Sequence, residues 1–202
     1  AIGTWSAVAS AKRDQGDIGL IWIDAHMDSH TPETSSSQNI HGMPVAHLLG
    51  HGVTSLCRLF DDAPKLKPEN ICLVGIRSYQ EGEAQLLKRL GVKIFFMSEI
   101  QERGIDVVFC EAQAHVSKAT CGFGISLDMD GIDPQDAPGV GCREPGGIEG
   151  AALVKALSDN VQKDALLGLE ITEYNPLRDV DAKSAHLLVD LMSAVYTQSS
   201  LT

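Results

Sequence analysis

Short apolar runs alternate with longer segments of mixed character along this chain of 202 residues. The runs are apolar almost throughout, which is typical of strands covered on both faces. The five expected strands are Gly19–Asp24, Ile71–Ile76, Lys93–Met97, Gly124–Asp128 and Ala165–Ile171. Their alternation with helical segments predicts an α/β fold around a mostly parallel sheet.

The segments between the strands have the apolar spacing of helices. The expected helices are Trp5–Arg13, Met43–Leu49, Glu81–Leu90, Val107–Ser117, Glu149–Leu157 and Ala182–Thr197. A further short helix is expected after the third strand, because Ser98 to Gln101 has the spacing of a capping box. The chain shows no internal repeat and no linker, so residues 1–202 are predicted to form one domain.

Two acidic clusters stand at the polar ends of two expected strands: Asp24-Ala25-His26-Met27-Asp28 and Asp128-Met129-Asp130. In an extended strand, residues two apart point to the same face, so each cluster is expected to converge on one point. Parallel sheets bind ligands beyond the carboxyl ends of their strands. Four carboxylates gathered there would repel one another unless cations lay between them. The sequence therefore predicts a metal site.

Composition and charge narrow the class of protein. The net charge of −11 argues against nucleic acid or an anionic membrane as a partner. The 44% hydrophobic content is that of a soluble globular protein, and no apolar run approaches the roughly 20 residues that span a bilayer. The five cysteines are scattered, without a CxxC pair, so a disulfide framework is not expected and a reducing cytoplasm fits best.

The acidic clusters resemble two motifs of the ureohydrolase family, which includes arginases and agmatinases. Asp24–Asp28 is similar to its D-A-H-x-D motif, and Ser126–Pro134 is similar to its S-x-D-x-D-x-x-D-P motif. The stretches 31–44, 75–83 and 173–176 are similar to arginases in particular. This resemblance runs along the whole chain, and it implies a three-layer αβα sandwich.

A third family motif, G-G-D-H-S, contributes a metal-ligand histidine and is not found in this chain. Residues 1–6 resemble the segment that follows it. The resemblance therefore implies that the chain lacks its N-terminal strands, and that one histidine ligand is expected upstream of residue 1.

The resemblance implies a binuclear manganese hydrolase that cleaves L-arginine to ornithine and urea. Asp24 and Asp128 would bridge two Mn²⁺ ions, and Asp28 would complete the first site together with the upstream histidine. His26 and Asp130 would complete the second site. A hydroxide that bridges the metals, hydrogen-bonded to Asp128, would attack the guanidinium carbon. Oxygen-rich ligation without sulfur suits Mn²⁺ better than Zn²⁺ or Cu²⁺.

Two further residues have catalytic roles by resemblance. His41 would carry a proton to the leaving amine, which suits an imidazole near neutral pH. Glu173 would bind the guanidinium through charge-assisted hydrogen bonds. Ser35, Ser37 and Asn39 occupy positions that bind the α-carboxylate of the amino acid in arginases. Taken alone, each of these residues would be read as an ordinary loop residue.

The substrate-binding positions depart from arginases at several points. Gln80 stands where arginases usually have an Asp facing the α-amino group, and His30 replaces an Asn in the carboxylate subsite. Gln38 replaces a Gly, which reduces backbone freedom at that turn. Cys142 stands where a Thr is common, whereas Glu83 is retained. These departures leave the metal chemistry unchanged and place the amino-acid subsite in question.

Three alternatives therefore stay open. The first is a related ureohydrolase for agmatine, guanidinobutyrate or formiminoglutamate. The second is a truncated remnant without activity that serves as a structural partner. The third is a zinc deacetylase of related fold, which needs only one metal and a catalytic histidine pair that the sequence does not show. By family analogy alone, a homo-oligomer, trimeric or hexameric, is expected.

Overall fold

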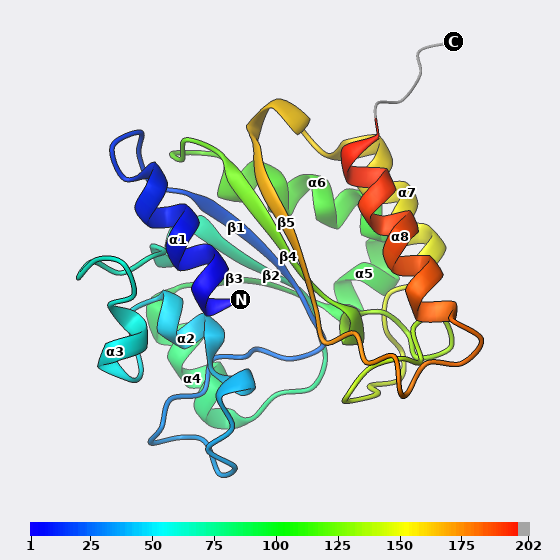
Figure 1. The fold of residues 1–202 in the computed structure, drawn as a ribbon, viewed down its shortest axis with the longest axis horizontal. Helices are drawn as coiled ribbons and strands as arrows, with labels where there is room; N and C mark the ends of the chain where they lie inside the picture. The colour runs from blue at the N-terminus through cyan, green and yellow to red at the C-terminus, as the bar shows by residue number, and fades with distance from the viewer. Residues whose placement is uncertain (198–202) are drawn as a thin grey trace.

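Five parallel strands form the centre of the molecule (Figure 1), in the order β3-β2-β1-β4-β5. The computed structural model describes residues 1–197. The strands are β1 (Gly19–Ile23), β2 (Ile71–Ile76), β3 (Lys93–Phe96), β4 (Phe123–Asp128) and β5 (Leu166–Thr172). Each lies within one residue of its expected bounds, and the predicted α/β fold with a parallel sheet is confirmed.

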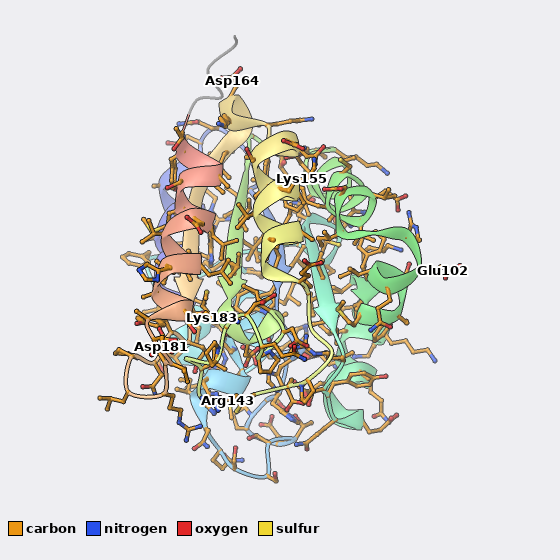
Figure 2. All side chains as sticks on the ribbon, turned by 90° about the vertical axis from the view of Figure 1, so that its right-hand side faces the viewer. Glu102, Arg143, Lys155, Asp164, Asp181 and Lys183 are labelled. Atoms are coloured by element: carbon orange, nitrogen blue, oxygen red, sulfur yellow. The ribbon has the colours of Figure 1, made fainter. Side chains whose placement is uncertain are left out.

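Helices cover both faces of the sheet (Figure 1). One layer contains α1 (Ile2–Lys12), α2 (Pro44–Leu48) and α4 (Glu81–Leu90), with the short α3 (Thr54–Cys57) beside α2. The other contains α5 (Met97–Arg103), α6 (Ile105–Val116), α7 (Gly150–Asn160) and α8 (Lys183–Tyr196). In Figure 2, Glu102 on α5 and Lys155 on α7 lie on the outer surface of this second layer.

Strand β1 shows how the sequence builds two cores at once. Its residues are buried throughout. Ile21 and Ile23 pack in the core under α5–α8, whereas Leu20 and Trp22 pack in the core under α1, α2 and α4. Alternate side chains of a strand point to opposite faces, so a continuously apolar run is what a strand between two helical layers requires.

The helices differ from their expected bounds by up to three residues, as in α1, α6 and α7, and two further details differ. The short helix after β3 exists, but it begins at Met97, so Ser98 is not its capping residue. The Glu99 carboxylate instead accepts a hydrogen bond from the Phe96 backbone N–H, at 3.4 Å. The helix α3 was not predicted, because four residues are too few to show a helical period.

The strand order places a topological switch beside β1. From β1 the chain moves outward to β2 and β3, then returns to pair β4 with the other side of β1. In open parallel sheets, ligands bind at the carboxyl ends of the strands where the order reverses. Both acidic clusters follow the two strands that flank this point. Within residues 1–197, no helix is long and apolar enough to cross a membrane.

Candidate metal centre and substrate cavity

The two acidic clusters fold through the same local hydrogen bond. Asp24 accepts the backbone N–H of His26 at 2.7 Å, and Asp128 accepts the backbone N–H of Asp130 at 2.9 Å. The expectation of a continuing extended strand is therefore wrong in detail, because β1 ends at Ile23 and Asp130 lies in a 3-10 turn. In each cluster the first aspartate closes a tight turn with its own backbone, as Asp readily does. The turn then brings the third residue over the strand end.

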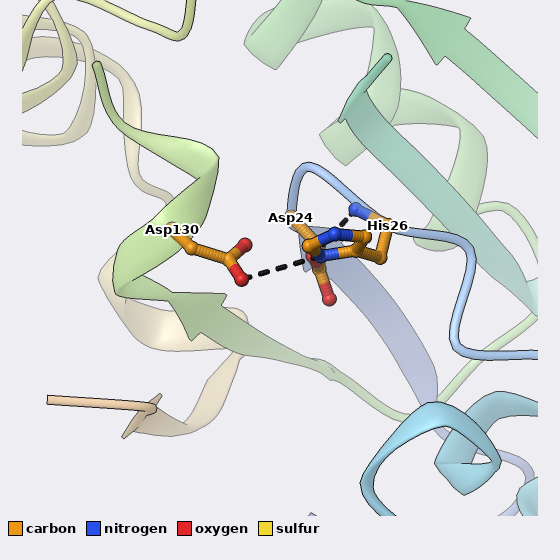
Figure 3. Close-up of side chains that lie close together, drawn as sticks. All are labelled: Asp24, His26 and Asp130. Atoms are coloured by element: carbon orange, nitrogen blue, oxygen red, sulfur yellow. Dashed lines mark hydrogen bonds and ion pairs between the residues drawn. The ribbon is translucent and has the colours of Figure 1, made fainter. Parts of the chain in front are cut away.

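Asp24, His26 and Asp130 form a compact group of possible metal ligands (Figure 3). One ligand atom from each lies within 4.8 Å of the others. The His26 Nδ1 atom is 3.2 Å from Asp130 Oδ2 and 3.5 Å from Asp24 Oδ1. The indole N–H of Trp22 donates to the other oxygen of Asp24 at 2.8 Å. One oxygen of Asp24 is thus fixed by the core while the other faces the imidazole.

Asp28 and Asp128 lie outside that compact group but face the same cavity. Thr172, at the end of β5, donates its hydroxyl to Asp128 Oδ2 at 3.1 Å. Asp28 has a left-handed backbone with φ of 48°, a conformation that Asp tolerates better than most residues. We call Asp24, His26, Asp28, Asp128 and Asp130 the cation cluster.

A cavity of about 220 Å³ extends from the cation cluster to the surface. The structure brings together here every metal, catalytic and substrate-binding residue predicted from the sequence. Asp24, Asp128 and Asp130 are buried at 1%, 6% and 5% exposure and form the floor. Seven of the lining residues are exposed, and we call five of them, Ser37, Asn39, His41, Tyr79 and Gln80, the rim.

Burial dominates the electrostatics of the floor. Loss of hydration raises the pKa of Asp24 to about 7, and the nearby charge of Asp130 adds to this. Loss of hydration also raises the pKa of Asp28 and Asp128 well above the usual range, with the charge of Asp24 as the next cause. Burial lowers the pKa of His26, but hydrogen bonds to Asp130 and Asp24 outweigh it and raise this pKa to about 12.

These shifts describe carboxylates that repel one another in a dry site. A divalent cation would remove this repulsion, and hard oxygen donors with a single imidazole suit Mn²⁺. The residues of the cation cluster therefore fit the predicted metal. Asp28 and Asp128 can also serve as ligands, because both line the cavity beside the compact group.

Both carboxylate oxygens of Glu83, a predicted substrate-binding residue, accept hydrogen bonds from the backbone. Its Oε1 accepts the Ser29 N–H at 3.2 Å, and its Oε2 accepts the Gln80 N–H at 2.9 Å. The His30 Nε2 atom is 3.3 Å from Oε2. Glu83 thus joins the start of α4 to the loop after the first cluster, and buried as it is at 4% exposure, it orders both.

The loop of residues 31–39 carries the predicted carboxylate subsite. The Ser35 hydroxyl accepts the Gln38 N–H at 3.0 Å, and the Ser37 hydroxyl accepts the Asn39 N–H at 3.3 Å. Both hydroxyls keep their own hydrogen for donation to a ligand. Gln38 has φ of 59°, so the turn has the left-handed backbone that glycine adopts most readily. Gln38 therefore has a backbone conformation that a residue with a side chain adopts less readily than the glycine that it replaces.

Sequence reasoning missed several residues around the floor. Trp22 and Thr172 each hold a carboxylate of the cation cluster. Glu144 brings its Oε1 to 3.6 Å from His26 Nε2, and Arg77 binds backbone carbonyls beside the cluster. Of these contacts, only that of Trp22 with Asp24 had a signal in the sequence, because the two residues are two apart and residues two apart share a strand face. The other contacts depend on how separate loops meet.

Comparison with known proteins agrees with this geometry. A family model described as the arginase family matches residues 1–197. The chain belongs to the arginase family. It is 44% identical to an arginase of Brevibacillus brevis over 199 residues, which are 97% of this chain. It is 41% identical over 195 residues, 96% of this chain, to an arginase of Bacillus subtilis.

The arginase-family fold is equally clear in three dimensions. The structure matches that of an arginase from Bacillus caldovelox with a TM-score of 0.92 at 38% identity, covering 99% of this chain and 66% of the other. The chain spans 65% of the length of the Brevibacillus brevis relative and 64% of the Bacillus subtilis relative. The recognised family and the predicted arginase-like fold are thus confirmed.

Proposed function

We propose that this chain carries most of the active site of a manganese-dependent hydrolase that cleaves L-arginine to ornithine and urea. One observation supports this above all: the residues predicted for metal, guanidinium and amino-acid binding come from separate loops and line one cavity. The relatives at 36% to 44% identity that bear the name arginase support the same substrate.

The cation cluster would hold two Mn²⁺ ions. Asp24 and Asp128 would be shared, His26 and Asp130 would belong to one ion, and Asp28 to the other. We propose that a histidine from outside residues 1–202 completes the ligand set of the ion that Asp28 would hold. When bound, the ion pair supplies a strong nucleophile at neutral pH and an electrostatic partner for developing charge.

The remaining residues would bind and orient the substrate. Glu173, in a left-handed backbone conformation with φ of 61° at the end of β5, would pair with the guanidinium. His41, exposed at the rim, would transfer a proton to the leaving amine nitrogen. Ser35, Ser37 and Asn39 would donate to the α-carboxylate.

The amino-acid end of the substrate would meet a largely neutral rim. Gln80 offers an amide oxygen to the α-amino group without a formal charge, and the oxygens of Glu83 are already occupied by backbone N–H groups. His30 lies against Glu83 and would act through it.

The five cysteines are all free, which supports a reducing cytoplasm. A homo-oligomer, trimeric or hexameric, is part of the proposal by family analogy.

The test is product release by the Mn²⁺-loaded protein, expressed from its complete reading frame. We expect urea from L-arginine at a rate at least tenfold above that from agmatine or 4-guanidinobutyrate. Formamide release from formiminoglutamate is measured in parallel. A faster reaction with any of these competitors would assign a sister activity, and no reaction with metal bound would support the inactive remnant.

A further inference from the structure

Among residues 1–197, the hydrogen-bond partners of Arg77, the residue directly after β2, are all backbone carbonyls. Its Nη1 donates to the carbonyl oxygens of Gly75 at 3.3 Å and Gly131 at 3.1 Å. Its Nη2 donates to those of Asp130 at 2.8 Å and Glu144 at 2.7 Å. The guanidinium therefore joins the end of β2, the turn after β4 and the loop that follows that turn.

The surroundings of Arg77 provide acceptors for both of its Nη atoms, whereas its buried Nε has no hydrogen-bond partner in the described part of the chain. Arg77 is half-buried, and in the described part of the chain no carboxylate oxygen lies within 4.0 Å of it. A Cβ atom on Gly147 would lie 2.6 Å from backbone atoms of Ile132 and Asp133 and 2.7 Å from Nη2, so glycine there lets the loop pack against both that backbone and the guanidinium. A planar group with five donors can hold several carbonyls at once, which a lysine ammonium cannot do in the same geometry.

Both residues that Nη2 holds also face His26, as Asp24 does. The Asp130 carboxylate lies 3.2 Å from His26 Nδ1, and the Glu144 carboxylate lies 3.6 Å from His26 Nε2. The imidazole thus stands between two carboxylates whose backbones are bound to one nitrogen. In metal sites, an acceptor on the distal ring nitrogen fixes the tautomer and orientation of a ligand histidine.

We propose that Arg77 is a positioning residue of the cation site. It fixes the backbones of Asp130 and Glu144, and so holds Asp130 toward one imidazole nitrogen of His26 and Glu144 toward the other. This inference rests on the proposed cation site, and it adds Arg77 and Glu144 to the residues on which cation binding depends.

The main experiment replaces Arg77 by lysine in the protein expressed from its complete reading frame. Mn²⁺ stoichiometry and affinity are measured by equilibrium dialysis, and thermal unfolding is recorded without the cation. We expect one Mn²⁺ to bind 10- to 100-fold more weakly. The cation-free melting temperature should change little, because lysine keeps the charge and one or two of the carbonyl contacts.

Arg143→Lys is the matched control. Arg143 lies in the loop that carries Glu144, and like Arg77 it donates to backbone carbonyls, those of Pro138 and Arg178, at 2.8 Å each. It is an exposed residue that does not line the cavity (labelled in Figure 2). We expect Arg143→Lys to keep Mn²⁺ affinity within about twofold of the wild type, whatever it does to the melting temperature.

Glu144→Gln tests the second half of the inference without touching Arg77. It keeps the shape of the side chain and the carbonyl that Arg77 binds, but it removes the charge opposite His26. We expect weaker Mn²⁺ binding, and the double variant should lose less than the product of the single losses, because both changes loosen one contact.

The outcomes separate this inference from the proposed function. A wild-type protein that binds no Mn²⁺ would overturn the cation site itself. A wild type that binds Mn²⁺, with Arg77→Lys binding equally well, would overturn only the role of Arg77. If Arg77→Lys does not fold, unchanged affinity in Glu144→Gln overturns the inference, and a 10-fold or greater loss in that variant supports it.

Discussion

The floor and the rim of the cavity are stabilised by different physics. The floor carboxylates follow β1 and β4 in the middle of the sheet, almost without solvent contact, and several are held by backbone or core donors. The rim residues are exposed and come from loops. Charges interact strongly where water is excluded and weakly where it is present. Changes at the floor should therefore have much larger effects than changes at the rim.

The largest effect is expected from Asp128→Asn. Asparagine keeps the size of the side chain and an acceptor for the Asp130 N–H, but it removes a charge that the two cations would share. We expect kcat/KM to fall at least about 1,000-fold, equivalent to about 4 kcal/mol, with loss of bound Mn²⁺. Steady-state kinetics and metal analysis measure both quantities.

Asp159→Asn is the control for this variant. Asp159 is an exposed residue on α7 that pairs with Lys155, far from the cavity lining. It should leave kcat/KM and Mn²⁺ content unchanged. Normal metal content in Asp128→Asn would show that this carboxylate is not a shared ligand.

The second prediction concerns pH and removal of the cation. Because the folded-state pKa of Asp24 is raised to about 7 from an ordinary value near 4, the folded state binds more protons than the unfolded state between these values. Although the lowered pKa of Asp130 acts in the opposite direction, the contribution of Asp24 to stability is largest below about pH 4 and is lost as the pH rises to about 7. The raised pKa values of Asp28 and Asp128 act in the same direction. We expect the cation-free protein to lose on the order of 2–4 kcal/mol.

Urea unfolding at pH 4.5 and pH 7, with and without saturating Mn²⁺, checks this prediction. The cation needs ionised carboxylates, so its stabilising effect should grow over the same interval. A cation-free protein that becomes more stable between pH 4.5 and pH 7 would contradict the raised pKa values of these buried carboxylates.

The contrast between floor and rim also explains what the sequence could predict. Asp24 and His26, like Asp128 and Asp130, are two residues apart at strand ends, so local chain geometry and a parallel sheet suffice to bring them together. The strands themselves were predictable because each is apolar almost throughout. Even here, the sequence implied that each strand continues through its acidic cluster. Each cluster instead forms a turn that is closed by a hydrogen bond to its first aspartate.

Contacts between loops could not be predicted in the same way. Arg77 binds carbonyl oxygens, which every residue has, so no side-chain pattern marks its partners. The approach of Glu144 to His26 depends on the path of the loop between Gly131 and Ile148, whose two ends are joined by a backbone hydrogen bond. The family resemblance indicated which loops face the substrate, but not that Glu83 is occupied by backbone donors.

The third prediction tests the rim through His41→Asn. If His41 transfers a proton to the leaving amine, its loss should lower kcat about 100-fold, while KM and Mn²⁺ content stay near the wild-type values. Added imidazole should restore part of the rate, because the side chain is exposed. His51→Asn is the control, since His51 does not line the cavity. An unchanged kcat in His41→Asn would remove the residue from the mechanism.

The smallest effect is expected from Gln80→Asp. This change would place a carboxylate at the exposed rim, where it can attract the α-amino group of L-arginine. Because water screens an exposed pair, the gain should be about 1 kcal/mol or less, which corresponds to a two- to fivefold rise in kcat/KM for L-arginine. Aspartate is also a favourable residue before the first turn of a helix, so α4 should keep its stability.

Two comparisons test whether this small gain comes from attraction between the new carboxylate and the α-amino group of the substrate. 4-Guanidinobutyrate has no α-amino group, so Gln80→Asp should not improve its hydrolysis, and repulsion of its carboxylate should reduce it slightly. The gain for L-arginine should shrink as salt rises from 0.05 M to 0.5 M, because the screening length falls about threefold over that interval, from roughly 14 Å to roughly 4 Å. Equal gains for both substrates, or a gain that salt leaves unchanged, would mean that the new carboxylate acts on the rim itself and not on the substrate ammonium.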